Sequence, residues 1–478
     1  MTLLSIQFMA FVLAWGLLFF VSPAKFRPFV LLLSNFVFYG FFSFPILCLI
    51  VTCSSADFIV SKLIAQSGSI KRKKVLLFGA ISYNVLLLVL FKYSNWLLSV
   101  AAHIASIVGI DCGARMHLDL ILPLGISFYT LESISYLVDV YRGSAPAKSW
   151  WHYNLYMMWF PHLLAGPIVR FCKLSEQYIN GIERPSLSRV KEGFLLILFG
   201  CVGKVVVADF AASVADPIFN NPGQQGALIT AAGFLAFGTQ LLWDFWGYSQ
   251  IARGISLLFN IELPVNFNRP FTAKNLADFW QRWHISLSQW LHDYVFLPLG
   301  GRTRNLQKSM IAVSITMFVA GLWHGANTKY LALGLYFAVG ISAYHLYRRC
   351  RHRIFGKSES ALLRSHFYGS ACWCLTQAYV IIGASFLRVP NLNTLSSMLQ
   401  KFGQRSDILQ DALTSGGRSA LFCITMFWIL SWVPFRRIYN DHFVRIPSFV
   451  QAPAFACVIA LCWICAAQTP KPFIYFQF

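Results

Sequence analysis

The chain contains the apolar run Ser309-Met-Ile-Ala-Val-Ser-Ile-Thr-Met-Phe-Val-Ala-Gly-Leu-Trp323, which has no charged side chain and leads directly into His324 and Gly325. Such a run is typical of a membrane helix, where an ionisable side chain costs free energy unless it is paired or functional. Gly321 and Gly325 lack a Cβ, so another backbone or a substrate can approach closely. We interpret the run as a membrane helix that holds one imidazole.

The composition extends this interpretation to all 478 residues. Hydrophobic residues make up 57% and charged residues 12%, and the mean hydropathy is +0.58, which excludes a soluble globular protein. Apolar stretches lie near 4–22, 28–60 (two short passes), 75–92, 94–110, 118–140, 153–169, 194–210, 227–246, 309–323, 329–347, 369–387, 417–434 and 449–467. Several are short or interrupted by Gly and Pro, which predicts re-entrant or interfacial segments. We expect an all-α polytopic membrane protein of one domain, 1–478, with about 11–13 transmembrane or re-entrant helices around a central cavity or tunnel.

Basic residues exceed acidic ones by 39 to 18, and the excess is clustered. The clusters are Lys71-Arg-Lys-Lys74, Arg348 to Arg353, and Arg436-Arg437. The positive-inside rule makes them cytoplasmic loop anchors, and no soluble basic face for nucleic acid is visible. The last span, 449–467, then leaves the cytoplasm, so we expect the tail 468–478 on the outer side. The first span has no preceding basic residue or cleavage site, and we expect it to be retained.

The polar stretch 265–309 mixes Trp, His, Arg and Asp with apolar residues at helical spacing. The apolar positions are Phe279, Trp283, Leu287, Trp290, Leu291 and Tyr294. Their spacing predicts an amphipathic helix on or in the membrane, with His284 and Ser288 one turn apart. We expect this helix to pack beside the segment that ends at His324.

Two histidines follow tryptophans in segments with little charge, at Trp283-His284 and Trp323-His324. This pattern suits a buried general base and a second, assisting imidazole. It also suits two interfacial imidazoles, each satisfied by a backbone carbonyl, and the residues alone leave both interpretations open. The twelve cysteines are scattered without histidines that would complete a zinc site, so no metal ion is expected.

Six motifs occur in order along the chain. They are Leu122-Pro-Leu-Gly-Ile-Ser-Phe-Tyr-Thr130, Ser135-Tyr-Leu-Val-Asp-Val-Tyr-Arg142, Phe160-Pro-His-Leu-Leu-Ala-Gly-Pro-Ile168, Asp244-Phe-Trp-Gly-Tyr-Ser249, Phe279-Trp-Gln-Arg-Trp-His-Ile-Ser286 and Gly321-Leu-Trp-His-Gly325. Together they resemble the membrane-bound O-acyltransferases, in particular the bacterial branch of alginate and peptidoglycan O-acetylation and teichoic acid D-alanylation proteins. The resemblance covers at least residues 28–345, with the core motifs in 120–345. It implies that His324 is catalytic and that His284 is the second polar residue of the pair.

The chain closes on Phe473-Ile-Tyr-Phe-Gln-Phe478. This is similar to the Phe-x-Tyr-x-x-Phe terminus that is proposed to carry an acyl group in the same branch, either at the enzyme's own end or on a small companion protein. The resemblance implies that Tyr475 is an acyl acceptor. An aromatic anchor at the membrane interface is the other interpretation. A phenol of pKa about 10 lies close to a thiol of about 8.5, whereas a sugar hydroxyl lies nearer water's roughly 15.7. A tyrosyl ester would therefore keep most of a thioester's transfer potential.

The resemblance implies an acyltransferase of the bacterial inner membrane with no bound cofactor, which takes an acyl group, acetyl in the first instance, from acetyl-CoA or another cytoplasmic thioester. It also implies an extracytoplasmic SGNH-type, esterase-like partner that makes the final transfer to a polysaccharide, with membrane lipid around the chain. The candidates for substrate-lining positions are Trp323, Arg282, Gln281, Asn327, Asp244 and Glu132. A transporter or flippase of an acylated or lipid-linked intermediate is the alternative. It would explain broken helices but not His324, His284 and the tail together.

Overall fold

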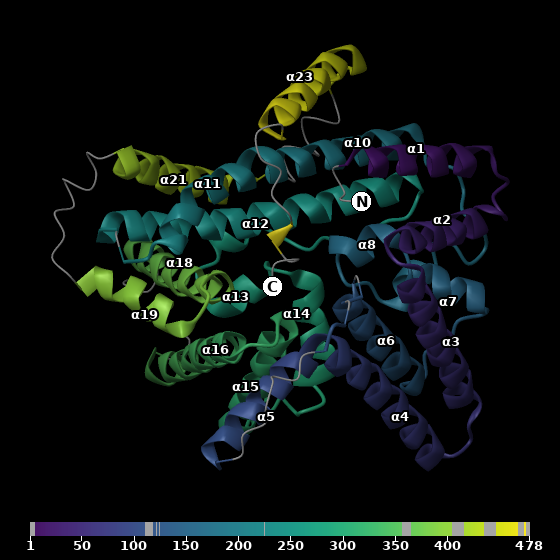
Figure 1. Ribbon diagram of the computed structural model, residues 1–478, viewed down its shortest axis with the longest axis horizontal. Coiled ribbons are helices and arrows are strands. Elements are labelled where there is room, and N and C mark those ends of the chain that lie inside the picture. The colour runs from purple at the N-terminus through teal and green to yellow at the C-terminus, as the bar shows by residue number, and fades with distance from the viewer. Residues whose placement is uncertain are drawn as a thin grey trace. The chain divides into compact units, whose positions relative to one another are not determined.

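The computed structural model describes residues 5–109, 118–120, 122–123, 125–223, 225–355, 365–403, 415–434, 446–466 and 473–474 (Figure 1). Throughout these ranges the regular structure is helical, apart from one isolated bridge between Ile179 and Gly181. The chain forms two compact units. The first comprises Met1–Ile197, Ala252–Pro264 and Gly325–Asn327, and the second Leu198–Ile251, Val265–His324 and Thr328–Phe478. The predicted all-α membrane fold is confirmed.

The first unit contains the N-terminal helices. They are α1 (Ile6–Val21), α2 (Arg27–Phe42), α3 (Phe44–Gln66), α4 (Ile70–Leu88), α5 (Ser94–Ile107), α6 (Ile126–Tyr141), α7 (Trp150–Met157), α8 (Phe160–Ala165), α9 (Phe171–Ser175) and most of α10 (Leu187–Cys201). Helices α3, α4 and α6 pack against one another around the buried carboxylate of Asp57. Ser133 Oγ, Asn84 Nδ2 and Tyr129 OH donate hydrogen bonds to it at 2.5, 2.9 and 3.2 Å. These hydrogen bonds offset the free-energy cost of burying the Asp57 side chain.

The second unit contains most of the remaining helices. They are α11 (Asp209–Asn220), α12 (Ala227–Leu258, whose last turns belong to the first unit), α13 (Leu276–Trp280), α14 (Ile285–Leu291), α15 (Leu306–His324), α16 (Thr328–Phe355), α18 (His366–Arg388), α19 (Leu392–Gln400), α21 (Ser415–Trp432) and α23 (Ser448–Ala466). Three π-helical segments, Val89–Tyr93, Val202–Ala208 and His292–Phe296, and two 3-10 turns, Pro270–Thr272 and Lys401–Gly403, complete the described elements. Helix α15 packs along α16, and α16 packs on α18.

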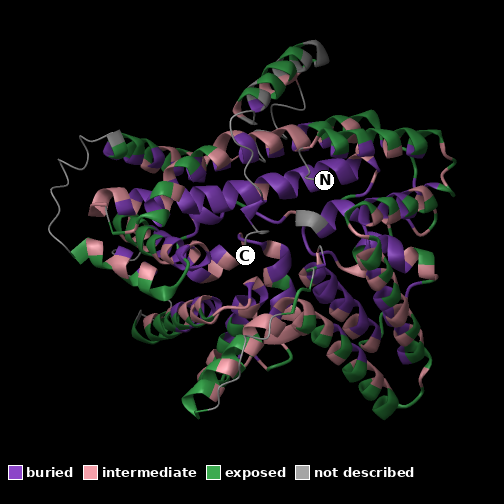
Figure 2. Cartoon of the chain, viewed as in Figure 1, coloured by how far each residue is buried: buried purple, intermediate pink, exposed green. Residues whose placement is uncertain are grey.

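Seven described helices are long and apolar enough to cross a membrane, including 227–258, 306–324 and 328–354. Figure 2 shows α12 buried along most of its length, whereas α4 keeps a broad exposed face. Within α12, 78% of the most apolar 18-residue stretch is buried, whereas only 11% of the corresponding stretch in residues 70–107 is buried. Because exposed apolar faces suit lipid, α12 is a core helix and α4 a lipid-facing one.

Three predicted spans differ from the structure in ways that the backbone explains. The stretches 75–92 and 94–110 were expected as separate passes, but residues 70–107 form one helical run of 38 residues. The π-helical segment Val89–Tyr93 continues the run instead of ending it. The stretch 153–169 is not a span, because the chain leaves helical geometry at Trp159, where ψ is 100°. The short helix α8 then begins at Phe160, with Pro161 in its first turn.

The prediction of one continuous amphipathic helix through 279–294 is wrong. It is interrupted between α13 and α14, because His284 adopts a left-handed backbone with φ of +40°. The apolar positions Phe279, Trp283, Leu287 and Trp290 are nevertheless buried. The rings of His284 and Trp323 lie 5.6 Å apart, so the expected position of this segment beside α15 is confirmed.

Candidate active site

His324 is the last residue of α15, and one close helix contact fixes its position. A Cβ on Gly321, one turn earlier, would lie 2.3 Å from the carbonyl oxygen of Tyr330 and 3.0 Å from the backbone nitrogen of Gly334, both on α16. Glycines therefore let the two backbones touch, as small residues do between membrane helices. The predicted close approach at Gly321 is confirmed, and the approaching group is a helix backbone.

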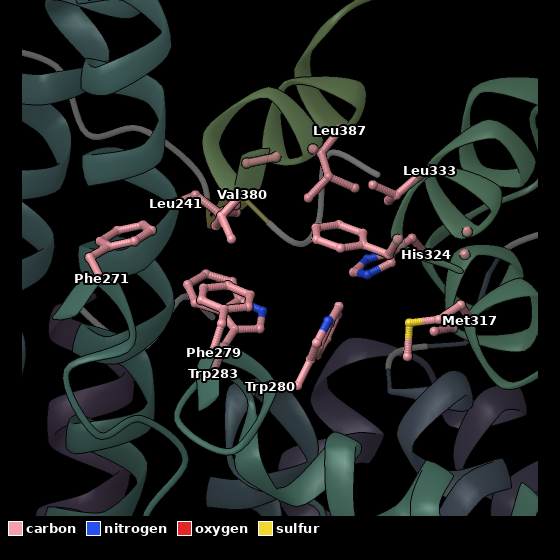
Figure 3. Close-up of a pocket in the computed structure, with 16 residues that line it drawn as sticks. Leu241, Phe271, Phe279, Trp280, Trp283, Met317, His324, Leu333, Val380 and Leu387 are labelled. Carbon is pink, nitrogen blue, oxygen red and sulfur yellow. The ribbon is translucent and has the colours of Figure 1, made fainter. Parts of the chain in front are cut away.

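A largely apolar cavity opens beside His324 (Figure 3). Its wall is built from α12, α13, α15, α16 and α18 together with neighbouring loop residues, and includes Leu241, Trp280, Met317, Phe337 and Val380. Among the described lining residues, His324 is the one titratable side chain. The volume is about 50 Å³, whereas one water needs roughly 10–15 Å³. The cavity therefore has room for a group of a few heavy atoms next to the imidazole.

His284 lies in the break between α13 and α14 and is 1% exposed. Its Nδ1 lies 3.2 Å from Oδ1 of Asn266, which also accepts hydrogen bonds from the backbone N–H and the hydroxyl of Ser286 at 3.2 and 2.9 Å. A backbone N–H can only donate, so the Asn266 atom is the oxygen and Nδ1 of His284 carries the hydrogen. The Nε2 atom of His284 is then the nitrogen that accepts a proton or a hydrogen bond.

The protonation state of His284 follows from its surroundings. Burial lowers the pKa of His284 well below its ordinary value of 6.5, and the nearby His324 lowers it further. The charged imidazolium is disfavoured because little solvent reaches it. His284 is therefore a neutral imidazole with a fixed tautomer, held in a strained backbone conformation of the kind that clusters at functional sites.

Aromatic rings connect the two histidines. The Trp323 ring lies 5.6 Å from His284 and 5.1 Å from His324, at 68° and 72° to the two imidazoles. The ring of Phe245 also lies 4.7 Å from His284, at 90°. Such edge-to-face contacts are favourable and fix ring orientation. Trp323, predicted as a substrate-lining residue, thus contacts both imidazoles.

Asp244, next to Phe245 on α12, binds the final segment of the chain. Its Oδ2 accepts a hydrogen bond of 2.6 Å from the backbone N–H of Ile474, 230 residues away. Phe473 and Ile474 are 1% and 2% exposed. Tyr475 follows directly in the sequence but lies outside the described residues.

Comparison with known proteins decides the family. The model of the membrane-bound O-acyltransferase family matches residues 148–363. A probable alginate O-acetylase of Pseudomonas putida is 30% identical over 489 residues, which cover 96% of each protein. The chain belongs to the membrane-bound O-acyltransferase family. A peptidoglycan O-acetyltransferase of Helicobacter pylori is 30% identical over 77% of this chain and 72% of its own length. A teichoic acid D-alanyltransferase of Streptococcus thermophilus is 31% identical over 46% and 55%.

Three further candidate residues of this acyltransferase were predicted to line the substrate site, namely Gln281, Arg282 and Asn327. Arg282 forms an ion pair of 2.6 Å with Asp278 one turn earlier, and both are partly exposed. Gln281 is exposed in the break after α13. Asn327 belongs to the loop Gly325–Asn327, which clusters with the first unit. Their substrate-lining role stays a prediction.

Glu132, on α6 of the first unit, has a partner that the sequence did not single out as a site residue. Its Oε2 lies 3.0 Å from His162 Nε2 on α8, and its Oε1 accepts a 3.0 Å hydrogen bond from the backbone N–H of Val169. Both side chains are 0% exposed. His162 lies in one of the family motifs, but a single sequence gives no sign that it meets a glutamate 30 residues earlier. The pair is a fully buried element of this acyltransferase's first unit.

Proposed function

We propose that this acyltransferase takes an acetyl group from cytoplasmic acetyl-CoA, transfers it to the hydroxyl of Tyr475, and so presents it to an extracytoplasmic SGNH-type partner that acetylates a polysaccharide. One observation carries the proposal. Phe473, two residues before Tyr475, lies 5.9 Å from the ring of Phe245, which itself packs on His284. The segment that leads to Tyr475 is therefore one aromatic ring away from the candidate catalytic pair.

The cavity supports a small, uncharged acyl group. A D-alanyl group carries an ammonium, which needs a carboxylate or several acceptors when it leaves water. None of the described lining residues has a carboxylate. An acetyl group has no such need, and its few heavy atoms match the volume of about 50 Å³. The relatives that match over most of the chain are likewise described as O-acetylating proteins.

In the proposed step, His324 removes the proton of the Tyr475 hydroxyl as its oxygen attacks the thioester carbonyl. The tetrahedral intermediate collapses, the carbon–sulfur bond breaks, and the imidazolium of His324 returns the proton to the leaving thiolate. The products are an acetyl-tyrosine ester and free CoA thiol. The ester then passes its acetyl group to an alcohol, which restores the Tyr475 hydroxyl.

An assisting imidazole could orient a substrate or stabilise the developing oxyanion, and the tautomer of His284 favours the first of these roles. With the hydrogen on Nδ1 held by Asn266, the Nε2 atom of the neutral ring can accept but not donate. His284 therefore suits the orientation of a hydroxyl better than the stabilisation of an oxyanion, which needs a donor. We assign it the positioning of the acceptor hydroxyl.

The relatives indicate the wider setting. Their names refer to alginate, peptidoglycan and teichoic acid. We place the protein in the bacterial cytoplasmic membrane, with the donor on the cytoplasmic face, where the basic loops lie, and the polysaccharide on the outer face. Family membership favours this enzymatic function over a transporter or flippase.

The test uses purified full-length protein and acetyl-CoA radiolabelled in the acetyl group. Wild type should release thiol and gain label on Tyr475, located by mass spectrometry. His324→Ala should do neither, and Tyr475→Phe should remain unlabelled. His103→Ala, an exposed histidine on α5, is the matched control and should behave as wild type. Thiol release and labelling that persist in His324→Ala would refute the proposed catalysis, and labelling elsewhere than Tyr475 would refute the relay.

A further inference from the structure

An ion cluster is buried in the second unit at the start of the Asp244-Phe-Trp-Gly-Tyr-Ser249 motif. Oδ1 of Asp244 lies 2.7 Å from Lys204 Nζ, and the two side chains are 2% and 3% exposed. Lys204 belongs to the π-helical segment Val202–Ala208, and its Nζ also lies 2.7 Å from Oδ1 of Asp209. Charges at such depth persist only when they are paired or functional.

Lys204 does not depend on Asp244 for neutralisation, because Asp209 already provides a carboxylate. Asp244 uses its two oxygens separately. Oδ1 faces Lys204, and Oδ2 accepts the 2.6 Å hydrogen bond from the backbone N–H of Ile474. A buried N–H without an acceptor is costly, and a bond to a carboxylate is stronger than one to a neutral oxygen. The second oxygen thus binds the final segment of the chain.

Aromatic contacts of Phe473 accompany this hydrogen bond. The ring of Phe473 lies 4.2 Å from that of Tyr248, one turn after Asp244 on α12. It also lies 5.9 Å from Phe245, the ring that packs on His284. The residue that holds the segment and the residue that packs on His284 are therefore neighbours on one rigid helix.

We propose that Asp244, held by Lys204, is a positioning residue that docks the Phe473–Ile474 segment by its backbone and sets where Tyr475 reaches. The docking needs only the hydrogen bond to Ile474 and the ring contacts of Phe473, whereas the effect on transfer rests on the proposed acetyl-tyrosine step. Because the carboxylate accepts a hydrogen bond from a backbone N–H, this bond does not depend on the side chain at position 474. Proline at this position would abolish the bond, since it has no N–H.

Docking is measured first, without any activity. Hydrogen exchange of the purified full-length protein, followed on its C-terminal peptide, reports the Ile474 amide. Asp244→Ala should lower its protection at least about tenfold, and Asp244→Asn, which keeps an accepting oxygen, should lower it less. Ile474→Pro should expose the neighbouring amides, whereas Ile474→Ala keeps its N–H and should remain protected. The two Ile474 variants leave Asp244 and Lys204 in place, so they test the docking even if Asp244→Ala does not fold. Wild-type protection of the C-terminal peptide in Ile474→Pro, or in a folded Asp244→Ala protein, would overturn the proposal.

Transfer is measured second, with radiolabelled acetyl-CoA. Asp244→Ala and Ile474→Pro should acetylate Tyr475 at least about tenfold more slowly, with the KM for acetyl-CoA unchanged, because the donor cavity lies at His324. Asp244→Asn should restore part of the rate. A released segment with an unchanged labelling rate would overturn the positioning role. If wild type itself is never labelled at Tyr475 while Asp244→Ala still loses protection, the relay fails and the docking site stands.

Discussion

Gly321→Ala tests whether the contact between α15 and α16 sets the position of His324. The new Cβ would lie 2.3 Å from the carbonyl oxygen of Tyr330, whereas ordinary contact begins at 3.4 Å. The backbones must therefore separate by about 1.1 Å, the difference of the two distances. Overpacking of this kind costs about 1–3 kcal/mol of stability. A displacement of about 1 Å at a catalytic group lowers the rate by roughly a hundredfold.

The assay is acetyl-CoA turnover by thiol release, together with thermal unfolding in detergent. We expect Gly321→Ala to lower kcat by roughly a hundredfold and to lower the melting temperature. Gly79→Ala on α4 is the control, because its Cβ would meet no atom within 4 Å. It should keep wild-type turnover and stability. Wild-type turnover in Gly321→Ala would show that the α15–α16 contact does not position His324.

Three further outcomes follow from other parts of the structure. Burial lowers the pKa of His284 below 6.5, so below that pH the unfolded chain binds a proton there that the folded chain does not. The free energy of unfolding should therefore be constant above about pH 7 and fall below about pH 6.5. In a plot of melting temperature against pH, His284→Gln should flatten this fall. His162→Ala strands the buried carboxylate of Glu132 and should cost about 3–5 kcal/mol, more than Glu132→Gln, so equal melting temperatures would contradict the pairing. Phe337→Ala enlarges the cavity and should raise butyryl-CoA turnover relative to acetyl-CoA, and an unchanged ratio would show that the acyl group binds elsewhere.

Hydropathy predicts much of the helical fold, because an apolar stretch of sufficient length favours a membrane helix whichever residues it contacts in the folded protein. The expected segments at 227–246, 309–323, 329–347 and 369–387 correspond to α12, α15, α16 and α18. The errors lie where local geometry overrides hydropathy. Trp159 and Pro161 break an apolar stretch, and His284 interrupts an amphipathic one by its positive φ.

The sequence alone also singled out His324 and His284, because each follows a tryptophan in a segment with little charge, and it singled out the motif around Tyr475. It could not supply their partners. The hydrogen of His284 is fixed by Asn266, 18 residues away, and Glu132 is matched by His162 on another helix. Such pairs leave no local pattern, since neither spacing nor hydropathy records which helices become neighbours.

The membrane class, the family and the two imidazoles were thus determined by the sequence, because hydropathy and short motifs are properties of contiguous residues. The tertiary structure decided what those residues do. It placed an apolar cavity beside His324, gave His284 its tautomer, and brought the N–H of Ile474 to a carboxylate 230 residues away. The physical reason is that each of these depends on buried polar groups finding partners, and only the tertiary arrangement of the helices determines which partners are within reach.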